Sequence, residues 1–391
     1  MTNASNFKCV GITTMFRNNY GSILQCYATK HYIEEKGFTC VILERSWEDD
    51  NIIDKIRHKS KILAKMIRYP EFLSVRATTK RNAPRELSII SPKTQQLMDE
   101  FVNNEFSPKA CNFNELKKIG RDESYIGFIT GSDQVWNLGR SLEPFYFLEF
   151  TDKEKRYTLS PSFGIDRVPE FNKNDLRKKL LGFNDISIRE ESGKKIVEEL
   201  TGKSAVRLAD PTLLLSKEEW LEVGRNTSIN NDNPYVLAHF LNEPSELAVQ
   251  TMNKIAKKIG LNIIGIGFKH DKFKGLSNFT FVDGGPDTYL KYIDQAELIC
   301  SDSFHTTLFS INLRKNFYTF ERQYLHGFPQ TSRIVDLLHR CGLASRLISS
   351  DILPEMMISW EQSEEIIEQE RLKIRNYVTD GILNIFGRQG T

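Results

Sequence analysis

The N-terminal part of the chain follows the order strand, helix, strand, and few folds accommodate that order. Lys8 to Thr13 is a short apolar stretch, and Ser22 to Lys36 carries apolar residues at the spacing of one helix face. Gly37 is placed to end that helix, and Thr39 to Leu43 is a second apolar stretch. Two strands joined by a helix run parallel, so we expect a parallel sheet covered by helices.

The same alternation begins again in the second half of the chain. Between the halves, residues 216–234 are polar and rich in asparagine, which predicts an interdomain linker. We therefore expect an α/β fold with two domains, residues 1–215 and 235–360. The charged segment 361–391 begins with a helical pattern that is long enough to cross back to the first domain.

Charge and composition exclude several classes of protein. The 53 basic and 51 acidic residues leave a formal net charge of only +2, which gives no field that favours nucleic acid. The N-terminus lacks the features of a signal peptide, and no stretch approaches the ~20 apolar residues of a membrane span. The cysteines form no CxxC pair, and the histidines show no zinc-binding spacing. We expect a cytoplasmic protein without a metal site.

Residues 51–85 interrupt the alternation and are strongly basic. They hold ten basic residues against two acidic ones, with Ile56, Leu63, Met66 and Ile67 interleaved. A solvated excursion on one face of the first domain is the interpretation that the sequence alone favours. The alternative is a basic amphipathic surface that contacts anionic lipid or a lipid-linked substrate at the inner face of the membrane.

Polar residues gather where predicted strands end, which is where doubly wound sheets bind ligands. The strongest cluster is 301–307, directly after a predicted strand. His305, in the first turn of the next helix, can serve as an acid or base, and Asp302 could orient its imidazole. Alternatively, Asp302 or Ser303 only caps the helix, and His305 packs in the domain interface.

Arg189 follows the predicted strand 185–188. An arginine at a strand end can bind a carboxylate or phosphate through two parallel hydrogen bonds. The alternative, which spacing alone favours, is a structural ion pair with Glu190 or Glu191.

Two further clusters lie in the first domain. Gly21, in the turn before the first helix, could let a ligand approach the backbone closely, although no phosphate-binding glycine motif is present. That turn could equally be a simple cap formed by Ser22. Asp133, Gln134 and Trp136 suit the hydroxyls and ring face of a sugar, with a capped turn and a half-buried tryptophan as the alternative.

Five motifs in order along the chain together resemble the polysaccharide pyruvyl transferase family. Each is weak alone, but five in order at predicted strand ends, from about Val10 to Leu338, form a specific pattern. The motifs are Asn19-Tyr20-Gly21-Ser22, Gly131-Ser132-Asp133-Gln134-Val135-Trp136-Asn137, Ser187-Ile188-Arg189-Glu190-Glu191-Ser192, Ala209-Asp210-Pro211-Thr212 and Ser301-Asp302-Ser303-Phe304-His305.

The resemblance implies two Rossmann-like domains facing a cleft, as in the GT-B glycosyltransferases. It implies transfer of pyruvate from phosphoenolpyruvate to a hexose of a surface glycan, or of its lipid-linked precursor, as a cyclic ketal. This chemistry requires no cofactor, metal or nucleotide. His305 matches the family's active-site histidine, and Arg189 matches its donor-binding arginine. Two rival functions remain: a GT-B glycosyltransferase with a nucleotide-sugar donor, and an inactive binding protein of the same fold.

The chain departs from the family pattern beside the histidine. Many members have arginine two residues before it and glycine directly after it, where this chain has Ser303 and Thr306. We expect these two residues to contribute to the phosphate site through the helix N-terminus. Arg333 or Lys269 would replace the missing cation, with Arg322 as a weaker candidate. The residues expected on the acceptor side are Asn19, Tyr20, Asp133, Gln134 and Trp136.

Overall fold

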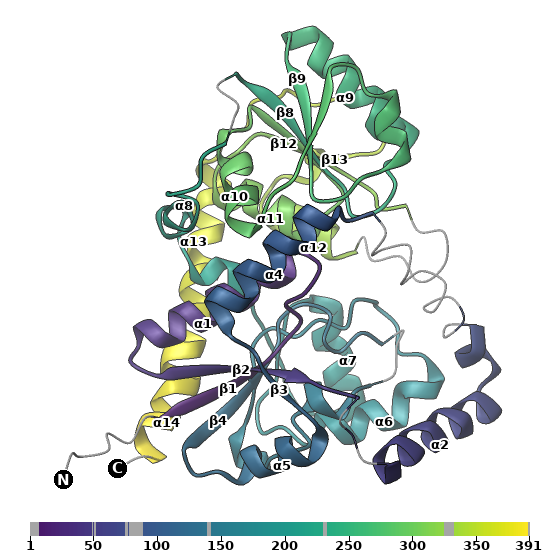
Figure 1. Cartoon of the computed structure of the whole chain (residues 1–391), viewed down its shortest axis with the longest axis vertical. Coiled ribbons are helices and arrows are strands. Elements are labelled where there is room, and N and C mark those ends of the chain that lie inside the picture. Colours follow the sequence, from purple (N-terminus) through teal and green to yellow (C-terminus); the bar gives the residue numbers. More distant parts are fainter. Residues whose placement is uncertain are drawn as a thin grey trace.

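Two parallel sheets, each covered by helices, form the centre of the molecule (Figure 1). The computed structural model describes residues 8–48, 50, 52–74, 77, 89–138, 142–229, 233–323 and 332–389. The sheets are stacked end to end along the long axis of the molecule, and helices from both meet between them.

The first sheet has the strand order β3-β2-β1-β4-β5, and every neighbouring pair is parallel. Its strands are β1 (Cys9–Thr13), β2 (Thr39–Arg45), β3 (Lys109–Cys111), β4 (Tyr125–Thr130) and β5 (Arg156–Thr158). In the register, Ile12 lies between Ile42 and Ile129, so three β-branched side chains share one buried face. The short strands β6 (Ser187–Ile188) and β7 (Val206–Arg207) pair separately.

The second sheet has the order β10-β9-β8-β11-β12-β13 and is also parallel throughout. Its strands are β8 (Tyr235–His239), β9 (Asn262–Ile266), β10 (Phe279–Val282), β11 (Leu298–Ser301), β12 (Phe317–Phe320) and β13 (Leu347–Ile348). In each sheet the first strand of the domain lies centrally and the chain winds outward in both directions, which is the Rossmann order. Ligands of such sheets bind beyond the carboxyl ends of the strands.

Helices connect the strands and cover both sheets. In the first domain these are α1 (Tyr20–Glu35), α2 (Ile52–Arg68), α4 (Pro92–Phe106), α5 (Phe113–Arg121), α6 (Glu170–Leu180) and α7 (Glu191–Thr201). In the second they are α9 (Glu246–Ile259), α10 (Pro286–Gln295), α11 (Phe304–Asn312) and α12 (Ser332–Arg340). None of the helices in the described part of the chain is both long and apolar enough to cross a membrane.

The polar segment expected to be a linker contains a helix, α8 (Lys217–Val223). Ser216 and Glu219 close it with a capping box, and the side chain of Trp220 is fully buried. The indole N–H of Trp220 donates to the carbonyl of Thr212 at 2.8 Å. A linker assignment based on average polarity missed this helix, because one buried aromatic residue and two capping side chains hold it in place.

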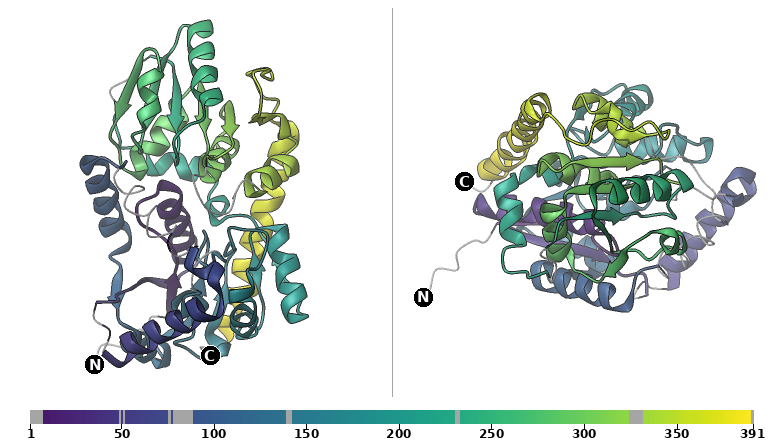
Figure 2. Two further views of the ribbon diagram at one scale, coloured as in Figure 1. Left: turned by 90° about the vertical axis from the view of Figure 1, so that its right-hand side faces the viewer. Right: turned by 90° about the horizontal axis from the view of Figure 1, so that it is seen from above.

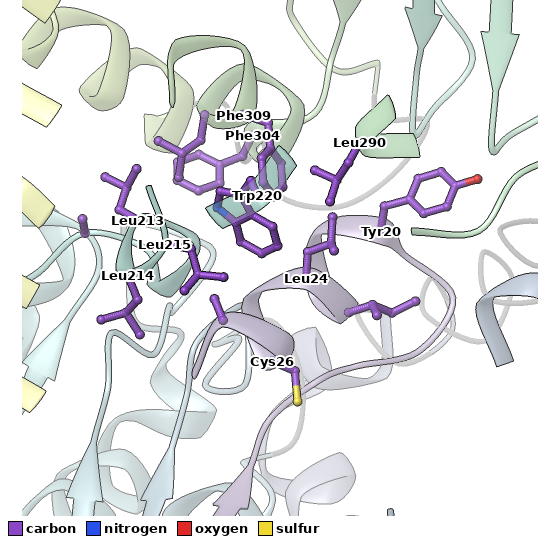
Figure 3. Close-up of a cluster of buried hydrophobic side chains, with 14 of the residues drawn as sticks. Tyr20, Leu24, Cys26, Leu213, Leu214, Leu215, Trp220, Leu290, Phe304 and Phe309 are labelled. Carbon is purple, nitrogen blue, oxygen red and sulfur yellow. The ribbon is translucent and has the colours of Figure 1, made fainter. Parts of the chain in front are cut away.

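The two domains share a hydrophobic core (Figure 3). Tyr20 and Leu24 of α1 lie on the first-domain side, and Leu290 of α10 and Phe309 of α11 lie on the second-domain side. Trp220 packs between them, with its ring centroid 5.1 Å from that of Phe309. Burial of large side chains contributes about 1.5–3 kcal/mol each, so this shared core fixes the two sheets against one another.

The C-terminal segment returns to the first domain, as predicted. Helix α13 (Glu361–Asn376) continues through a π-helical segment, Tyr377–Leu383, into α14 (Asn384–Gln389). It runs along the side of both domains, and both views in Figure 2 show it (yellow) on the outside. In α14, the ring of Phe386 packs against that of Tyr157 in β5, with the ring centroids 4.9 Å apart. The fold is therefore an α/β arrangement of two Rossmann-like domains in the GT-B manner, with a crossing C-terminal helix.

Candidate active site

Loops from both domains meet at the carboxyl end of β11, where α11 begins. Ser303 is the N-cap of α11, and its hydroxyl accepts a hydrogen bond from the backbone N–H of Thr306 at 3.3 Å. His305 lies in the first turn and is buried. The helix start therefore holds one imidazole at the domain junction, together with the positive end of the helix dipole.

A second helix begins beside the same imidazole. Asn19 caps α1 by accepting from the backbone N–H of Gly21 at 2.8 Å and of Ser22 at 3.3 Å. A Cβ atom on Gly21 would lie 2.2 Å from both Cγ and Nδ1 of His305, closer than real Cβ contacts allow. Glycine is therefore required at this position for the N-termini of α1 and α11 to meet across the domain junction.

The carboxylate beside His305 belongs to Asp210, which follows β7. Its Oδ2 lies 3.4 Å from Nε2 of His305 and accepts from Nη1 of Arg189 at 2.6 Å. Its Oδ1 accepts from the backbone N–H and hydroxyl of Thr212, both at 3.0 Å. Burial opposes ionisation, but His305, Arg189 and the Thr212 N–H outweigh it and hold the pKa of Asp210 well below its usual range. Asp210 is therefore an anion at neutral pH.

Arg189 has two N–H groups that no residue of the described chain accepts. It is buried, and it stacks on the ring of Phe304 with 4.6 Å between Cζ and the ring centroid. Nη1 serves Asp210, while Nε and Nη2 are buried without a hydrogen-bond acceptor in the part of the chain that the structure describes. Glu190 lies 3.7 Å from Nε, which is an ion-pair distance rather than a hydrogen bond. The ion pair that spacing favours is therefore present, with Asp210 as well as Glu190 as its partners, and the binding of a ligand by Arg189 stays a prediction.

A second buried carboxylate, Asp133, lies on the first-domain side of the junction. It accepts a hydrogen bond from the hydroxyl of Ser22 in α1. Burial raises its pKa, but the charges of His305, Arg189 and Arg333, with the Ser22 hydroxyl, more than offset this and lower it overall. Asp133 is therefore ionised and electrostatically coupled to the same cations as Asp210.

Of the expected replacement cations, Arg333 reaches this place. It is buried in α12 and lies 5.8 Å from the ring of Phe304, on which Arg189 also stacks. Burial and the neighbouring Arg189 lower its pKa to about 10, so it stays charged at neutral pH. One pocket is lined by residues of both domains and of the crossing helix, among them Arg189, Asp210, Phe304, Arg333, Arg340 and Glu370. His305 adjoins this pocket through Asp210.

Lys269 and Arg322 do not line this pocket. Lys269 is exposed, and its ammonium lies 4.7 Å from the ring centroid of Phe281. Arg322 donates to the carbonyl oxygen of Asp302 at 3.3 Å, and its Nε atom lies 3.8 Å from the carboxylate of the same residue. The place expected for Lys269 is wrong, because its ammonium lies over a ring of β10 and not in the pocket with Arg189.

Asp302 does not orient His305, so that prediction is wrong. Its carboxylate accepts from the backbone N–H groups of Leu241 at 2.6 Å and Asn242 at 3.1 Å, after β8. Residues adjacent in a strand-to-helix turn point in different directions, and Asp302 is directed along the sheet toward the neighbouring strand. The carboxylate at the imidazole comes from Asp210, whose motif was identified in the sequence without a role.

Two residues expected on the acceptor side are core residues. Trp136 is fully buried, stacks on Phe147 with 4.9 Å between centroids, and donates its indole N–H to the carbonyl of Tyr146. Tyr20 is also fully buried and stacks on Tyr289 across the domain junction, 4.4 Å between centroids. In both residues another aromatic ring already covers a face of the side chain, so that face is not available to a sugar.

The other predicted residues have structural contacts at the junction. Gln134 is half-buried and accepts from the side-chain amide of Asn137 at 2.6 Å. The hydroxyl of Thr306 shares a hydrogen bond of 2.9 Å with that of Tyr289. Asn19 and Ser303 act as the helix caps described above. In the described part of the chain, no cluster of three or more His, Cys, Asp or Glu residues could hold a metal.

The sequence model of one family, described as polysaccharide pyruvyl transferase, matches residues 19–324. The chain belongs to the polysaccharide pyruvyl transferase family. The matched region contains all of the motifs above and both sides of the His305 site, and it makes the chain a transferase of polysaccharide biosynthesis. Arg333 lies beyond the matched region. Among proteins with curated descriptions, none matches this sequence.

Two solved structures share this fold at low sequence identity. UDP-GlcNAc 2-epimerase from Neisseria meningitidis, bound to UDP-GlcNAc, aligns over 97% of this chain and 100% of its own, with TM-score 0.50 and 10% identity. S. aureus MnaA with UDP aligns over 94% of this chain and 90% of its own, with TM-score 0.50 and 9% identity. At such low identity the likeness shows the fold alone.

Proposed function

We propose that this transferase moves pyruvate from phosphoenolpyruvate to two hydroxyls of one hexose, forming a cyclic ketal and releasing phosphate. The acceptor is a hexose of a surface polysaccharide or of a lipid-linked glycan precursor. The observation that carries the proposal is the buried group of His305, Asp210 and Arg189 at the domain junction of a chain in this family.

The donor is a small dense anion, and the junction offers it matching groups. Arg189 has N–H donors on Nε and Nη2 that no described residue accepts, and Arg333 adds a second guanidinium across Phe304. Guanidinium groups bind phosphate and carboxylate with two parallel hydrogen bonds. We assign the two arginines to the phosphate and carboxylate of phosphoenolpyruvate, with the N-terminus of α11 adding its dipole.

His305 is suited to move the proton that starts the reaction. Protonation of the methylene carbon makes the adjacent carbon electrophilic, and one acceptor hydroxyl adds to it as that hydroxyl loses its proton. Phosphate then leaves as the second hydroxyl closes the ring, and the proton of that hydroxyl departs with the phosphate. Asp210, fixed as an anion, stabilises the charged imidazole and holds its orientation.

Asp133 is the carboxylate that we assign to the acceptor. It is ionised, and a carboxylate accepts hydrogen bonds from sugar hydroxyls and can take a proton as a hydroxyl attacks. Ser22, which donates to Asp133, belongs to α1 and follows Gly21, which lies against His305. The carboxylate of Asp133 and the imidazole of His305 therefore both lie at the start of α1. The side chains of His305, Asp210, Asp133 and Arg189 are all less than a tenth exposed, and we expect the donor to reach them through the pocket that Arg189 and Asp210 line.

Thermal unfolding with phosphoenolpyruvate, and separately with UDP, GDP and CMP, tests the proposal. A ligand at a hundred times its Kd adds about 2.7 kcal/mol to the free energy of unfolding. We expect phosphoenolpyruvate alone to raise the melting temperature, and Arg333→Gln to abolish the rise. Arg225→Gln, at an exposed arginine outside the pocket, is the matched control and should keep it. Stabilisation by a nucleotide, with none by phosphoenolpyruvate, would assign the site to a sugar-nucleotide donor instead.

A further inference from the structure

Helix α2 carries an apolar stripe that the rest of the described chain does not cover. Ile52, Ile56, Leu63 and Ile67 are 75%, 61%, 57% and 77% exposed. Their spacing of four, seven and four residues places all four on one face of the helix, over about four turns. Isolated exposed aliphatic residues are ordinary, but four along one face of a helix mark a contact surface.

The opposite face of α2 attaches it to the domain. Lys65, about half a turn around the helix from the stripe, donates to Asn172 at 2.9 Å and pairs with Asp175 of α6 at 3.2 Å. Beyond the helix end, Phe72 is buried against Phe171, with 5.0 Å between ring centroids. The stripe therefore faces away from the molecule, and α2 lies at the periphery in Figures 1 and 2.

The charge of this helix is the second observation. Ile52–Arg68 contains six basic residues and one acidic residue, whereas the whole chain has a net charge of only +2. Lys55 and Lys59 are exposed and lie along one edge of the stripe, and Lys61 and Arg68 are exposed farther around. Lysine stems can extend along an apolar layer while their ammonium groups reach a charged one.

We propose that α2 is an interfacial helix that docks this protein on an anionic lipid bilayer. The stripe would enter the boundary between head groups and acyl chains, and the lysines would contact anionic head groups. Charge complementarity favours lipid over a second copy of this chain, because pairing two stripes would bring their lysine edges together. The inference concerns binding alone, so it does not depend on the reaction proposed above.

Co-sedimentation of the full chain with vesicles tests this inference. We expect binding to vesicles of phosphatidylcholine mixed with phosphatidylglycerol, weakening as salt rises, and none to phosphatidylcholine alone. The double substitution Ile56→Ser with Leu63→Ser should weaken binding at least tenfold, to order of magnitude. Lys55→Gln with Lys59→Gln should weaken it by about fivefold per lysine.

Matched controls come from the second domain. Ile352→Ser with Met357→Ser removes two exposed apolar residues there, and Lys257→Gln with Lys258→Gln removes two exposed lysines. Both should bind vesicles like the unaltered protein, and circular dichroism should show all variants folded. The proposal is overturned if the unaltered protein ignores anionic vesicles, or if the stripe variant binds them equally well. It is also overturned if sedimentation velocity shows that the stripe holds a dimer together.

Discussion

His305 and His239 are both buried at the domain junction, yet their surroundings give them different chemistry. Burial lowers the pKa of His239 to about 4, only partly offset by the carbonyl of Ile266, so it is neutral at pH 7. His305 instead lies with its Nε2 atom 3.4 Å from a carboxylate oxygen of Asp210. Substituting each histidine in turn therefore separates an effect on turnover from an effect on packing.

The substitution His305→Gln should lower turnover by at least a hundredfold, to order of magnitude, because it removes the proton-transferring group. His239→Gln should lower the melting temperature through lost packing while turnover stays within about tenfold. Phosphate release from phosphoenolpyruvate in the presence of acceptor measures both. Equal turnover in the two variants would remove His305 from the reaction.

Asp210 predicts a dependence of stability on pH. Its pKa in the folded protein lies below the ordinary value of 3.8, so its contribution is complete above that pH and is lost as the pH falls further. Asp210→Asn should lower the free energy of unfolding at neutral pH by about 3–5 kcal/mol, since Arg189 loses its buried partner. Urea unfolding at a series of pH values should also give the variant a shallower decline below about pH 4. An unchanged acid slope would contradict the role of Asp210.

The structure brings together the histidine and the arginine that the motifs indicate, but the carboxylate beside them is Asp210 and not Asp302. Asp302 was chosen because it is close to His305 in the chain, whereas Asp210 comes close only through the packing of the two domains. Trp136 was placed at the acceptor for its ring, and its burial depends on Phe147 and Phe163, which no local pattern relates to it. Roles that depend on contacts between domains could not be predicted locally.

At the scale of elements, the site depends on two helix N-termini that meet at Gly21 and His305. Gly21→Ala places a methyl group where the imidazole ring lies, so either the ring or the domain contact must shift. We expect at least a hundredfold loss of turnover, to order of magnitude, together with a lower melting temperature. Gly275→Ala is the matched control, because its nearest neighbour would lie 3.6 Å away. Normal turnover in Gly21→Ala would contradict the close approach.

The elements themselves were predicted with uneven success. Helix α1 was expected over Ser22 to Lys36 and spans Tyr20–Glu35, because its apolar residues recur at helical spacing and Gly37 follows its end. Helix α8 was missed, since its seven residues hold one buried aromatic side chain amid polar ones. Short helices anchored by a single side chain give too little periodicity to detect.

At the scale of the whole molecule, Arg371 is one residue through which the crossing helix contacts both domains. Arg371 of α13 donates to the carbonyls of Leu213 and Leu215, which precede the second domain, and to Asn312 of α11. Arg371→Met should lower the free energy of unfolding by about 3 kcal/mol, because buried acceptors lose their donors. Arg225→Met, at an exposed ion pair, should change it by less than about 0.5 kcal/mol. Urea unfolding of both variants measures these changes, and equal effects would contradict a role for Arg371 in holding the two domains together.

The most direct test of the central claim follows phosphoenolpyruvate and phosphate by phosphorus NMR while a panel of hexosides is supplied. The panel contains galactosides, glucosides, glucuronides and N-acetylmannosamine derivatives, and mass spectrometry follows each acceptor. The account predicts phosphate release that requires one of these acceptors, an acid-labile pyruvyl group on that acceptor, and loss of both in His305→Gln. Glycosyl transfer from a nucleotide sugar, with phosphoenolpyruvate unchanged throughout, would contradict it.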